Sequence, residues 1–324
     1  MQVLFIGGTG IISSACARLA VERGVDLVVC NRGASRRTIP AEVTRLVGNI
    51  RDPESARQAF GDLEFDVVVD WVAFTPAHIE ADLELFAGRT GQYIFISSAS
   101  AYQTPPAILP VTERTPLDNP VWQYSRDKIA CEERLLQALE ETGFPWTIVR
   151  PSHTYDRTLL PPHGGWTVID RMRHGEPIVV HGDGSSLWTL THHCDFALGL
   201  VGLMGRRDAV GEAFHITSDE WLTWDQIHHL LAHAAGTTAN SVHVPSQVIA
   251  GYDREWGDSL LGDKTHSMVF DNSKIKRYVP DFAATIPFAT GAREIMAWYD
   301  ADPARQEIDH ELNQTMDRII RNQR

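Results

Sequence analysis

A tyrosine and a lysine four positions apart are the residues in this chain whose types and spacing best suit chemistry. Tyr124 and Lys128 lie in the stretch YSRDK, inside a segment of helical pattern at 122–142. Residues four apart share one face of a helix, so the phenol and the ammonium project together. A free phenol has a pKa of about 10, and positive charge beside it, from the ammonium or an oxidised nicotinamide, favours deprotonation. Tyr124 is therefore a candidate base for a substrate hydroxyl, with a solvent-facing pair as the alternative.

A serine hydroxyl adds a third candidate group. The apolar run QYIFIS at 92–97 predicts a buried strand, and Ser98 follows it directly. Open parallel sheets bind ligands at the carboxyl ends of their strands. Ser98 is thus expected to hydrogen-bond the oxygen that reacts.

A glycine-rich turn lies near the start of the chain. Gly7, Gly8 and Gly10 stand between the strand-like run at 3–6 and a helical pattern at 11–23. Glycines permit the tight turn and let backbone amides approach a diphosphate at a helix N-terminus. Ser13 replaces the third glycine of the common fingerprint and is small enough for close packing. The turn predicts a dinucleotide site, with an ordinary strand–helix turn as the alternative.

A cluster of arginines follows the second predicted strand, DLVVC at 26–30. An acid at this place would bind the ribose 2′-hydroxyl of NAD, whereas an arginine accepts the 2′-phosphate of NADP. The acid is missing, and Asn31, Arg32, Arg36 and Arg37 stand there instead. The cluster favours NADP as cofactor, with NAD possible and a solvated basic loop as the alternative.

The elements that must position these residues alternate between strand and helix in the first half. Further strands are predicted at 44–48, 66–72 and 145–150, and Asn49 and Ile50 after the first of these are candidates for adenine contacts. This rhythm predicts an α/β fold, a Rossmann-type doubly wound parallel sheet. Residues 1–157 are expected to form the dinucleotide-binding domain, with 190–217 returning to it. Residues 158–324 are expected to form mainly a smaller C-terminal substrate-binding portion.

Composition narrows the function classes. The chain has 324 residues and a net charge of −13, which argues against nucleic acid as a partner. No apolar stretch reaches the roughly 18 residues that a membrane helix needs, and the first residues show no signal peptide. Four scattered cysteines suit free thiols in a reducing cytoplasm, so we expect a cytoplasmic enzyme.

The run His192, His193, Cys194 and Asp195 resembles a metal cluster in composition. Adjacent positions at the start of a helix point in different directions, so these side chains are not expected to reach one ion. No metal site is therefore predicted.

Six motifs in a fixed order suggest a family. They are GGTGII at 7–12, FISSASAY at 95–102, YSRDK at 124–128, RPSHTY at 150–155, GDGSSLWTLTHHCDFA at 182–197 and FDNSKIKR at 270–277. With these motifs most of the chain resembles the extended short-chain dehydrogenase/reductases, the NAD(P)-dependent epimerase/dehydratase family. The resemblance implies that Ser98, Tyr124 and Lys128 form the catalytic triad. It also implies a homodimer, formed through a four-helix bundle of the helices at about 76–88 and 122–142.

The resemblance and the patterns above together assign the remaining site residues. Those expected at the cofactor are Gly7, Thr9, Gly10, Ile11, Ile12, Asn31, Arg32, Arg36, Asn49, Ile50, Trp71, Val72, Ala73, Tyr124, Lys128, Pro151 and Ser152. The resemblance places residues 71–73 against the cofactor by their backbone and residues 151–152 near the nicotinamide. Those expected at the substrate are Ser98, Ser100, Tyr102, Tyr124, His153 and Trp188.

Two departures from the family pattern bear on the reaction. Family dehydratases carry an Asp-Glu pair after the catalytic hydroxyl residue, where this chain has Ala99 and Ser100. Members that act on nucleotide sugars have an arginine where this chain has Trp188, and an indole stacks on rings but cannot neutralise a diphosphate. The departures argue against a 4,6-dehydratase and weaken the case for a nucleotide sugar.

The leading hypothesis is an NAD(P)-dependent epimerase or oxidoreductase that acts on a secondary alcohol of a sugar or nucleotide-sugar-like substrate through a transient ketone, by a mechanism that uses the tyrosine, the lysine and the serine. One alternative is an NADPH-dependent reductase or dehydrogenase of a non-nucleotide substrate. The other is a non-catalytic protein, either a dinucleotide sensor or an RNA-associated family member.

Overall fold

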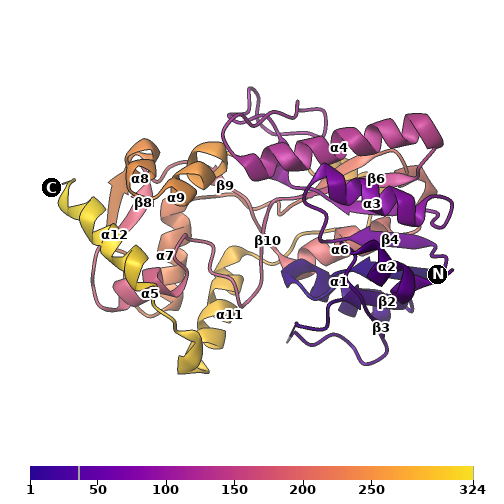
Figure 1. The fold of residues 1–324 in the computed structure, drawn as a ribbon. Helices are drawn as coiled ribbons and strands as arrows, with labels where there is room; N and C mark the ends of the chain where they lie inside the picture. The colour runs from indigo at the N-terminus through magenta and orange to yellow at the C-terminus, as the bar shows by residue number, and fades with distance from the viewer. Residues whose placement is uncertain (36, 324) are drawn as a thin grey trace.

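The computed structural model describes residues 1–35 and 37–323. They form two lobes side by side, with the N-terminus at the far end of one lobe and the C-terminus at the far end of the other (Figure 1). Among the described residues, no helix combines the length and the apolar composition needed to cross a bilayer.

The first lobe is built on a parallel sheet of seven strands. From edge to edge the strands are β11 (Ala213–Ile216), β6 (Trp146–Pro151), β5 (Tyr93–Ile96), β4 (Val67–Asp70), β1 (Gln2–Ile6), β2 (Asp26–Asn31) and β3 (Thr44–Val47). Both β4 and β5 are buried throughout, which explains their unbroken apolar runs. The order reverses between β1 and β4, and open α/β sheets bind ligands at such a point.

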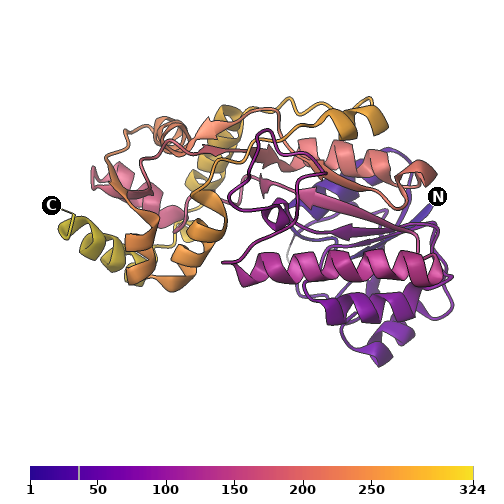
Figure 2. The ribbon, with the colours of Figure 1, turned by 90° about the horizontal axis from the view of Figure 1, so that it is seen from above.

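Helices cover both faces of this sheet (Figure 2). One face packs against α1 (Ile11–Glu22), α6 (His193–Leu203) and α10 (Ser273–Tyr278), and the other against α2 (Pro53–Phe60), α3 (Pro76–Phe86) and α4 (Gln123–Thr142). The predicted α/β, doubly wound fold is confirmed.

The chain leaves the sheet after β6 and returns to it later. The edge strand β11 pairs with β6, and α6 packs against α1. Segments around residues 193–203 and 213–216 thus belong to the first lobe in space. The assignment of the dinucleotide to the first lobe, and of the substrate mainly to the second, stays a prediction.

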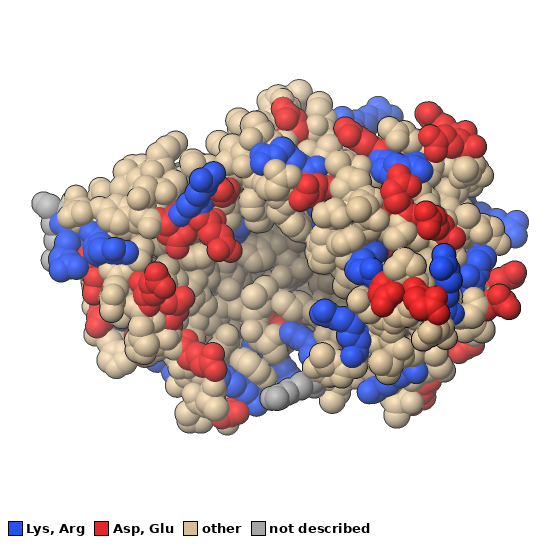
Figure 3. Space-filling view, in the orientation of Figure 1, with Lys and Arg blue, Asp and Glu red and all other residues tan. Residues whose placement is uncertain are grey.

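The second lobe is smaller and mainly helical, with its own apolar core. The elements outside the large sheet and its covering helices are β7 (His153–Tyr155), α5 (Trp166–Arg173), β8 (Ile178–His181), β9 (Leu187–Trp188), β10 (Leu190–His192), β12 (Leu222–Thr223), α7 (Trp224–Ala234), β13 (Ser241–Val244), α8 (Ser246–Tyr252), α9 (Arg254–Ser259), α11 (Phe288–Asp300) and α12 (His310–Arg321). A hollow separates the two lobes, and its visible floor is mostly uncharged (Figure 3).

Candidate active site

A cavity of about 550 Å³ lies between the lobes, and Ser98, Tyr124 and Lys128 all line it. Ser98 follows β5, whereas Tyr124 and Lys128 lie one turn apart on α4. The structure therefore brings the three predicted groups together at the carboxyl end of the sheet. We call this space the interlobe cavity.

Lys128 is almost fully buried, and its ammonium is held by the backbone. Nζ donates hydrogen bonds to the carbonyls of Ala73 at 2.7 Å and Ile96 at 2.8 Å. An ammonium has three donors, so one remains for a further acceptor. Burial lowers the pKa of Lys128 to about 8.

The pKa of Tyr124 differs from the expectation. Burial raises it, and a hydrogen bond from Ser98 counteracts part of that rise. The Nζ of Lys128 lies 5.8 Å from the phenol ring centroid and donates to two backbone carbonyls, and the pKa of Tyr124 is raised even with this lysine in place. The lysine alone therefore does not make Tyr124 a base at neutral pH, and a further positive charge beside the phenol is required.

A chain of hydroxyl groups orients Ser98. Its Oγ lies 2.9 Å from Oγ of Ser100, which in turn accepts from Ser125 Oγ at 2.8 Å. When Ser100 donates to Ser98, the one proton of Ser98 is left for the phenol of Tyr124 or for an oxygen in the cavity. Ser125 was not predicted, although it directly follows Tyr124 in the sequence.

His153 and Trp188 form a pair on the cavity wall. The indole Nε1 of Trp188 donates to Nδ1 of His153 at 3.1 Å, so a neutral His153 carries its proton on Nε2. Burial lowers the pKa of His153 to about 3, which keeps the ring neutral. Trp188 has used its only donor in this bond, so it has no hydrogen-bonding group left for a ligand. Pro151 and Ser152 line the same cavity.

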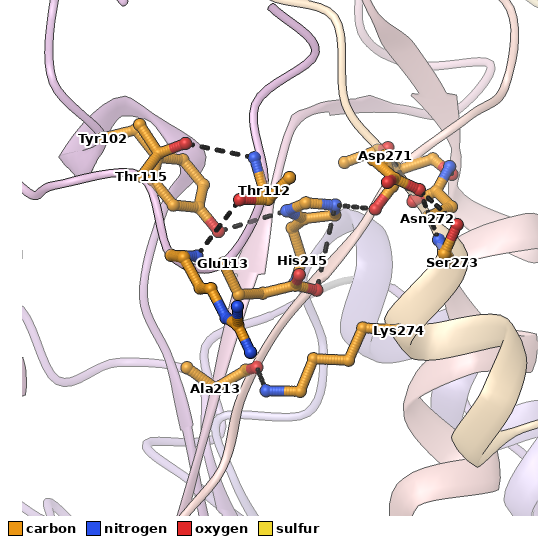
Figure 4. Close-up of polar contacts among 12 residues, drawn as sticks. Tyr102, Thr112, Glu113, Thr115, Ala213, His215, Asp271, Asn272, Ser273 and Lys274 are labelled. Atoms are coloured by element: carbon orange, nitrogen blue, oxygen red, sulfur yellow. Dashed lines mark hydrogen bonds and ion pairs between the residues drawn. The ribbon is translucent and has the colours of Figure 1, made fainter. Parts of the chain in front are cut away.

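Tyr102 does not reach the cavity, contrary to its assignment to the substrate. The short turn Ala99–Ala101 redirects the chain, and Tyr102 is fully buried with its hydroxyl on Nδ1 of His215 at 3.1 Å (Figure 4). His215 donates in turn from Nε2 to the carbonyl of Asp271 at 2.8 Å. Tyr102 thus helps to join the edge strand β11 to the segment that crosses between the lobes.

A second cavity, of about 360 Å³, lies at the glycine turn. Among the predicted cofactor residues, those that line it are Gly7, Thr9, Asn31, Arg32, Asn49, Ile50 and Val72, whereas Ile12 and Trp71 line the interlobe cavity. Gly7 and Gly8 have φ of +103° and +71°, and a Cβ on Gly8 would lie 2.9 Å from the side chain of Val29. The turn therefore admits only glycine at these positions.

Ser13 closes the turn against the start of α1. Its Oγ accepts a hydrogen bond from the amide of Gly10 at 2.7 Å. Ile11 and Ile12 open the helix, where backbone amides have no intrahelical acceptor. Their two amides are the donors that this turn offers to an anion.

Ala73 does not contact either cavity, contrary to its assignment to the cofactor. Its amide donates to Oδ1 of Asp70 at 2.9 Å, and its carbonyl holds Lys128. Asp70 is itself fully buried and paired with Arg51 at 2.9 Å. Ala73 therefore positions Lys128, and the strand end that carries it has no polar group left for a ligand at that residue.

The arginines after β2 do not all lie at the glycine-turn cavity. Arg32 lines the glycine-turn cavity, whereas Arg37 turns away to form an ion pair with Asp156 and a hydrogen bond to Thr158 at 2.5 Å. Arg36, also predicted at the cofactor, lies outside the described residues. Arg37 therefore fastens the loop after β2 to the segment after β7.

The histidine run is closer to a metal-binding arrangement than its sequence suggested. The side chains of His192, His193 and Cys194 place one potential ligand atom each within 4.8 Å of the others, so the argument from helix direction was wrong for these three. The reason is that His192 ends β10 and folds back, its Nδ1 accepting from the amide of Cys194 at 3.3 Å. Asp195 points elsewhere and accepts from the amide of Ile286 at 3.0 Å.

Comparison with known proteins adds a family. The family model described as NAD dependent epimerase/dehydratase matches residues 3–217. The chain is 26% identical to a 2′-dehydrokanamycin reductase of Streptomyces kanamyceticus, over 87% of this chain and 80% of that one. It is 28% identical to the chloroplast stem-loop binding protein of 41 kDa b of Arabidopsis thaliana, over 72% of this chain and 63% of that one.

Solved structures show the same fold. A UDP-glucose 4-epimerase of Thermotoga maritima superposes with a TM-score of 0.76 at 20% identity, covering 93% of this chain and 99% of that one. The epimerase Mth375 of Methanothermobacter thermautotrophicus superposes equally well at 18% identity, covering 94% of each chain.

Proposed function

Because the chain belongs to the NAD dependent epimerase/dehydratase family, we propose that it is an NAD(P)-dependent enzyme acting on a secondary alcohol, or the matching ketone, of a sugar-like ring. The observation that carries the proposal is the meeting of Ser98, Tyr124 and Lys128 in one cavity. The glycine turn stands beside it at the switch point of the sheet.

The residues present fit a nicotinamide dinucleotide. The bare turn at Gly7 and Gly8 leaves room for a diphosphate, and the amides of Ile11 and Ile12 are its donors. The remaining donor of Lys128 suits a ribose hydroxyl, and Arg32 suits a 2′-phosphate at the adenosine end. When bound, the nicotinamide supplies or accepts the hydride.

Three side chains handle the proton and the reacting oxygen. Ser98 turns its proton from the Tyr124 phenol to that oxygen, and Tyr124 takes the hydroxyl proton in oxidation or returns it in reduction. The positive charge that Tyr124 needs is that of an oxidised nicotinamide, with Lys128 holding the ribose beneath. His153 offers a neutral Nε2 donor on the opposite wall.

The cavity walls support a ring without a diphosphate. No arginine lines the described part of the interlobe cavity, and of its two lysines Lys128 is already held by carbonyls. The indoles of Trp122 and Trp188 line it instead, and such side chains pack well against a sugar-like ring. Net oxidation or reduction of such a ring is the form we favour, and a relative named as a reductase agrees with it.

The test is turnover by the purified protein. We expect NADPH to be consumed in proportion to an added polyhydroxylated cyclic ketone, and Tyr124→Phe to lower the rate about a hundredfold or more. Tyr252→Phe is the matched control, because the Tyr252 hydroxyl lies outside the cavity and accepts a hydrogen bond from Asn322. Unchanged turnover in Tyr124→Phe would refute the catalytic proposal, whereas tightly retained nicotinamide without net consumption would favour an epimerase.

A further inference from the structure

A turn of π-helix forms part of the wall that the second lobe contributes to the interlobe cavity. Leu260–Lys264 continue α9 with this wider turn, and Asp263 and Lys264 both line the cavity that Tyr124 lines. Single π-helical turns are rare and occur frequently at functional sites. Nothing in the proposed reaction uses these two side chains.

Asn119 fixes this turn to the catalytic groups. Its buried Nδ2 donates to the carbonyl of Gly262 at 2.7 Å and to the carbonyl of Ser100 at 3.0 Å. Its Oδ1 accepts from the amide of Trp122 at 3.0 Å, at the start of α4. A Cβ on Gly262 would lie 2.6 Å from Cβ of Trp122, so only glycine allows this approach. Asn119 thereby fixes the position of the π-helical turn relative to the segment after β5 and the start of α4.

Asp263 is a buried carboxylate whose side-chain partner is a single lysine, Lys264. It is 9% exposed, and within the described chain no hydrogen bond to either of its carboxylate oxygens is found. Its nearest cation is Lys264, with Oδ2 and Nζ 3.7 Å apart. Burial raises the pKa of Asp263 to about 6, and its charge also raises the pKa of Tyr124. With one lysine as its partner, this carboxylate keeps lone pairs that suit a hydrogen-bond donor of a ligand in the cavity.

Lys264 places a donor beside this acceptor. Its Nζ lies 5.3 Å from the ring centroid of Trp122, and its own carbonyl is held by Nε2 of His181 and Oγ of Ser186. A hydroxyl group can donate one hydrogen bond and accept two, so it fits between a carboxylate and an ammonium. A ligand ammonium would face Lys264, and a phosphate would face Asp263.

We propose that Asp263 and Lys264 bind a hydroxyl group of the substrate ring as acceptor and donor, and so select an uncharged, polyhydroxylated ring. The inference rests on the proposed function and names the substrate class of the same site.

The experiment measures binding of ring compounds that differ in charge to the protein saturated with NADP⁺. Glucose, galactose, mannose and myo-inositol are the neutral probes, glucosamine is the cationic probe, and glucose 6-phosphate and UDP-glucose are the anionic probes. Saturation-transfer NMR and quenching of tryptophan fluorescence report binding. We expect at least one neutral compound to bind, and to bind about tenfold or more tightly than every charged one.

Variants then locate the selectivity. Asp263→Asn and Lys264→Met should each weaken binding of the neutral ring about tenfold, while Asp258→Asn, an exposed acid on α9, should not. Both cavity variants keep the backbone contacts of the turn, and a thermal melt checks that they fold. Tighter binding of a charged probe, no binding of any neutral probe, or unchanged affinity in Asp263→Asn would overturn the inference.

Measuring both binding and turnover distinguishes a failure of this inference from a failure of the proposed function. Tyr124→Phe should bind the neutral ring normally but fail to reduce its ketone. Turnover that depends on Tyr124 together with indifference to Asp263 would leave the proposed function standing and the inference refuted.

Discussion

The indole nitrogen of Trp188 donates a hydrogen bond to Nδ1 of His153, and this one contact decides which nitrogen of the histidine faces a ligand. With Nδ1 occupied as an acceptor, a neutral imidazole keeps its proton on Nε2. Trp188 thereby gives the cavity wall a histidine of fixed tautomer in place of a charged group.

Trp188→Phe should keep an aromatic ring on the cavity wall but remove the hydrogen bond that fixes the tautomer of His153. We expect ¹⁵N NMR of the wild type to show a protonated Nε2 on His153 that does not titrate between pH 5 and 8, because burial lowers its pKa to about 3. In Trp188→Phe the two tautomers should mix. Trp221→Phe, a change at an exposed indole, should leave the His153 signals unaltered; a mixed tautomer in the wild type would contradict the prediction.

Lys128→Met should raise the melting temperature of the protein while lowering its turnover. The folded state lowers the pKa of Lys128 from 10.5 to about 8, so the unfolded chain binds more protons between these values. Stability therefore rises with pH across that window, and the buried charge is a penalty below it. At pH 7 the variant should melt higher than the wild type, and the difference should shrink by pH 10. Turnover should fall about a hundredfold or more. Equal melting temperatures at pH 7 would contradict the prediction.

Asp263→Asn should show a stability effect of the opposite pH dependence. The folded state raises the pKa of Asp263 from 3.8 to about 6, so the folded protein binds more protons between these values. The penalty of the buried charge is absent below about pH 4 and fully present above about pH 6. We expect the variant to melt a few degrees higher than the wild type at pH 8 and equally at pH 4. Differential scanning calorimetry at both pH values measures this, and a lower melting temperature at pH 8 would refute it.

Arg32→Asp should change the cofactor preference. The guanidinium lines the glycine-turn cavity, where it suits a 2′-phosphate, and a carboxylate there would repel that phosphate and accept from a 2′-hydroxyl. We expect the ratio of the Kd values for NAD⁺ and NADP⁺ to shift about tenfold or more toward NAD⁺ in calorimetric titrations. Arg45→Asp, at an exposed position of β3, serves as the control. If Arg32→Asp left this ratio unchanged, the arginine cluster would be a solvated basic loop with no part in selecting the cofactor.

The local sequence pattern was enough to predict the features that depend only on neighbouring residues in the chain. Buried runs predicted β4 and β5, and the four-residue spacing placed Tyr124 and Lys128 on one face of α4. The glycines between β1 and α1 predicted the bare turn, because a positive φ at Gly8 is a local requirement.

Contacts between distant residues decided the rest. Asn119 reaches Gly262 across 143 positions, and Arg37 reaches Asp156 across 119. Neither pairing leaves a periodic signal, because side chains that meet through folding obey no spacing rule. Tyr102 points away from the cavity for the same reason: its partner, His215, arrives with an edge strand that returns from the second half of the chain. The sequence alone thus specifies the sheet, the turn and the catalytic helix, whereas only the packing of the second lobe onto them brings Asp263 into the cavity that Tyr124 lines.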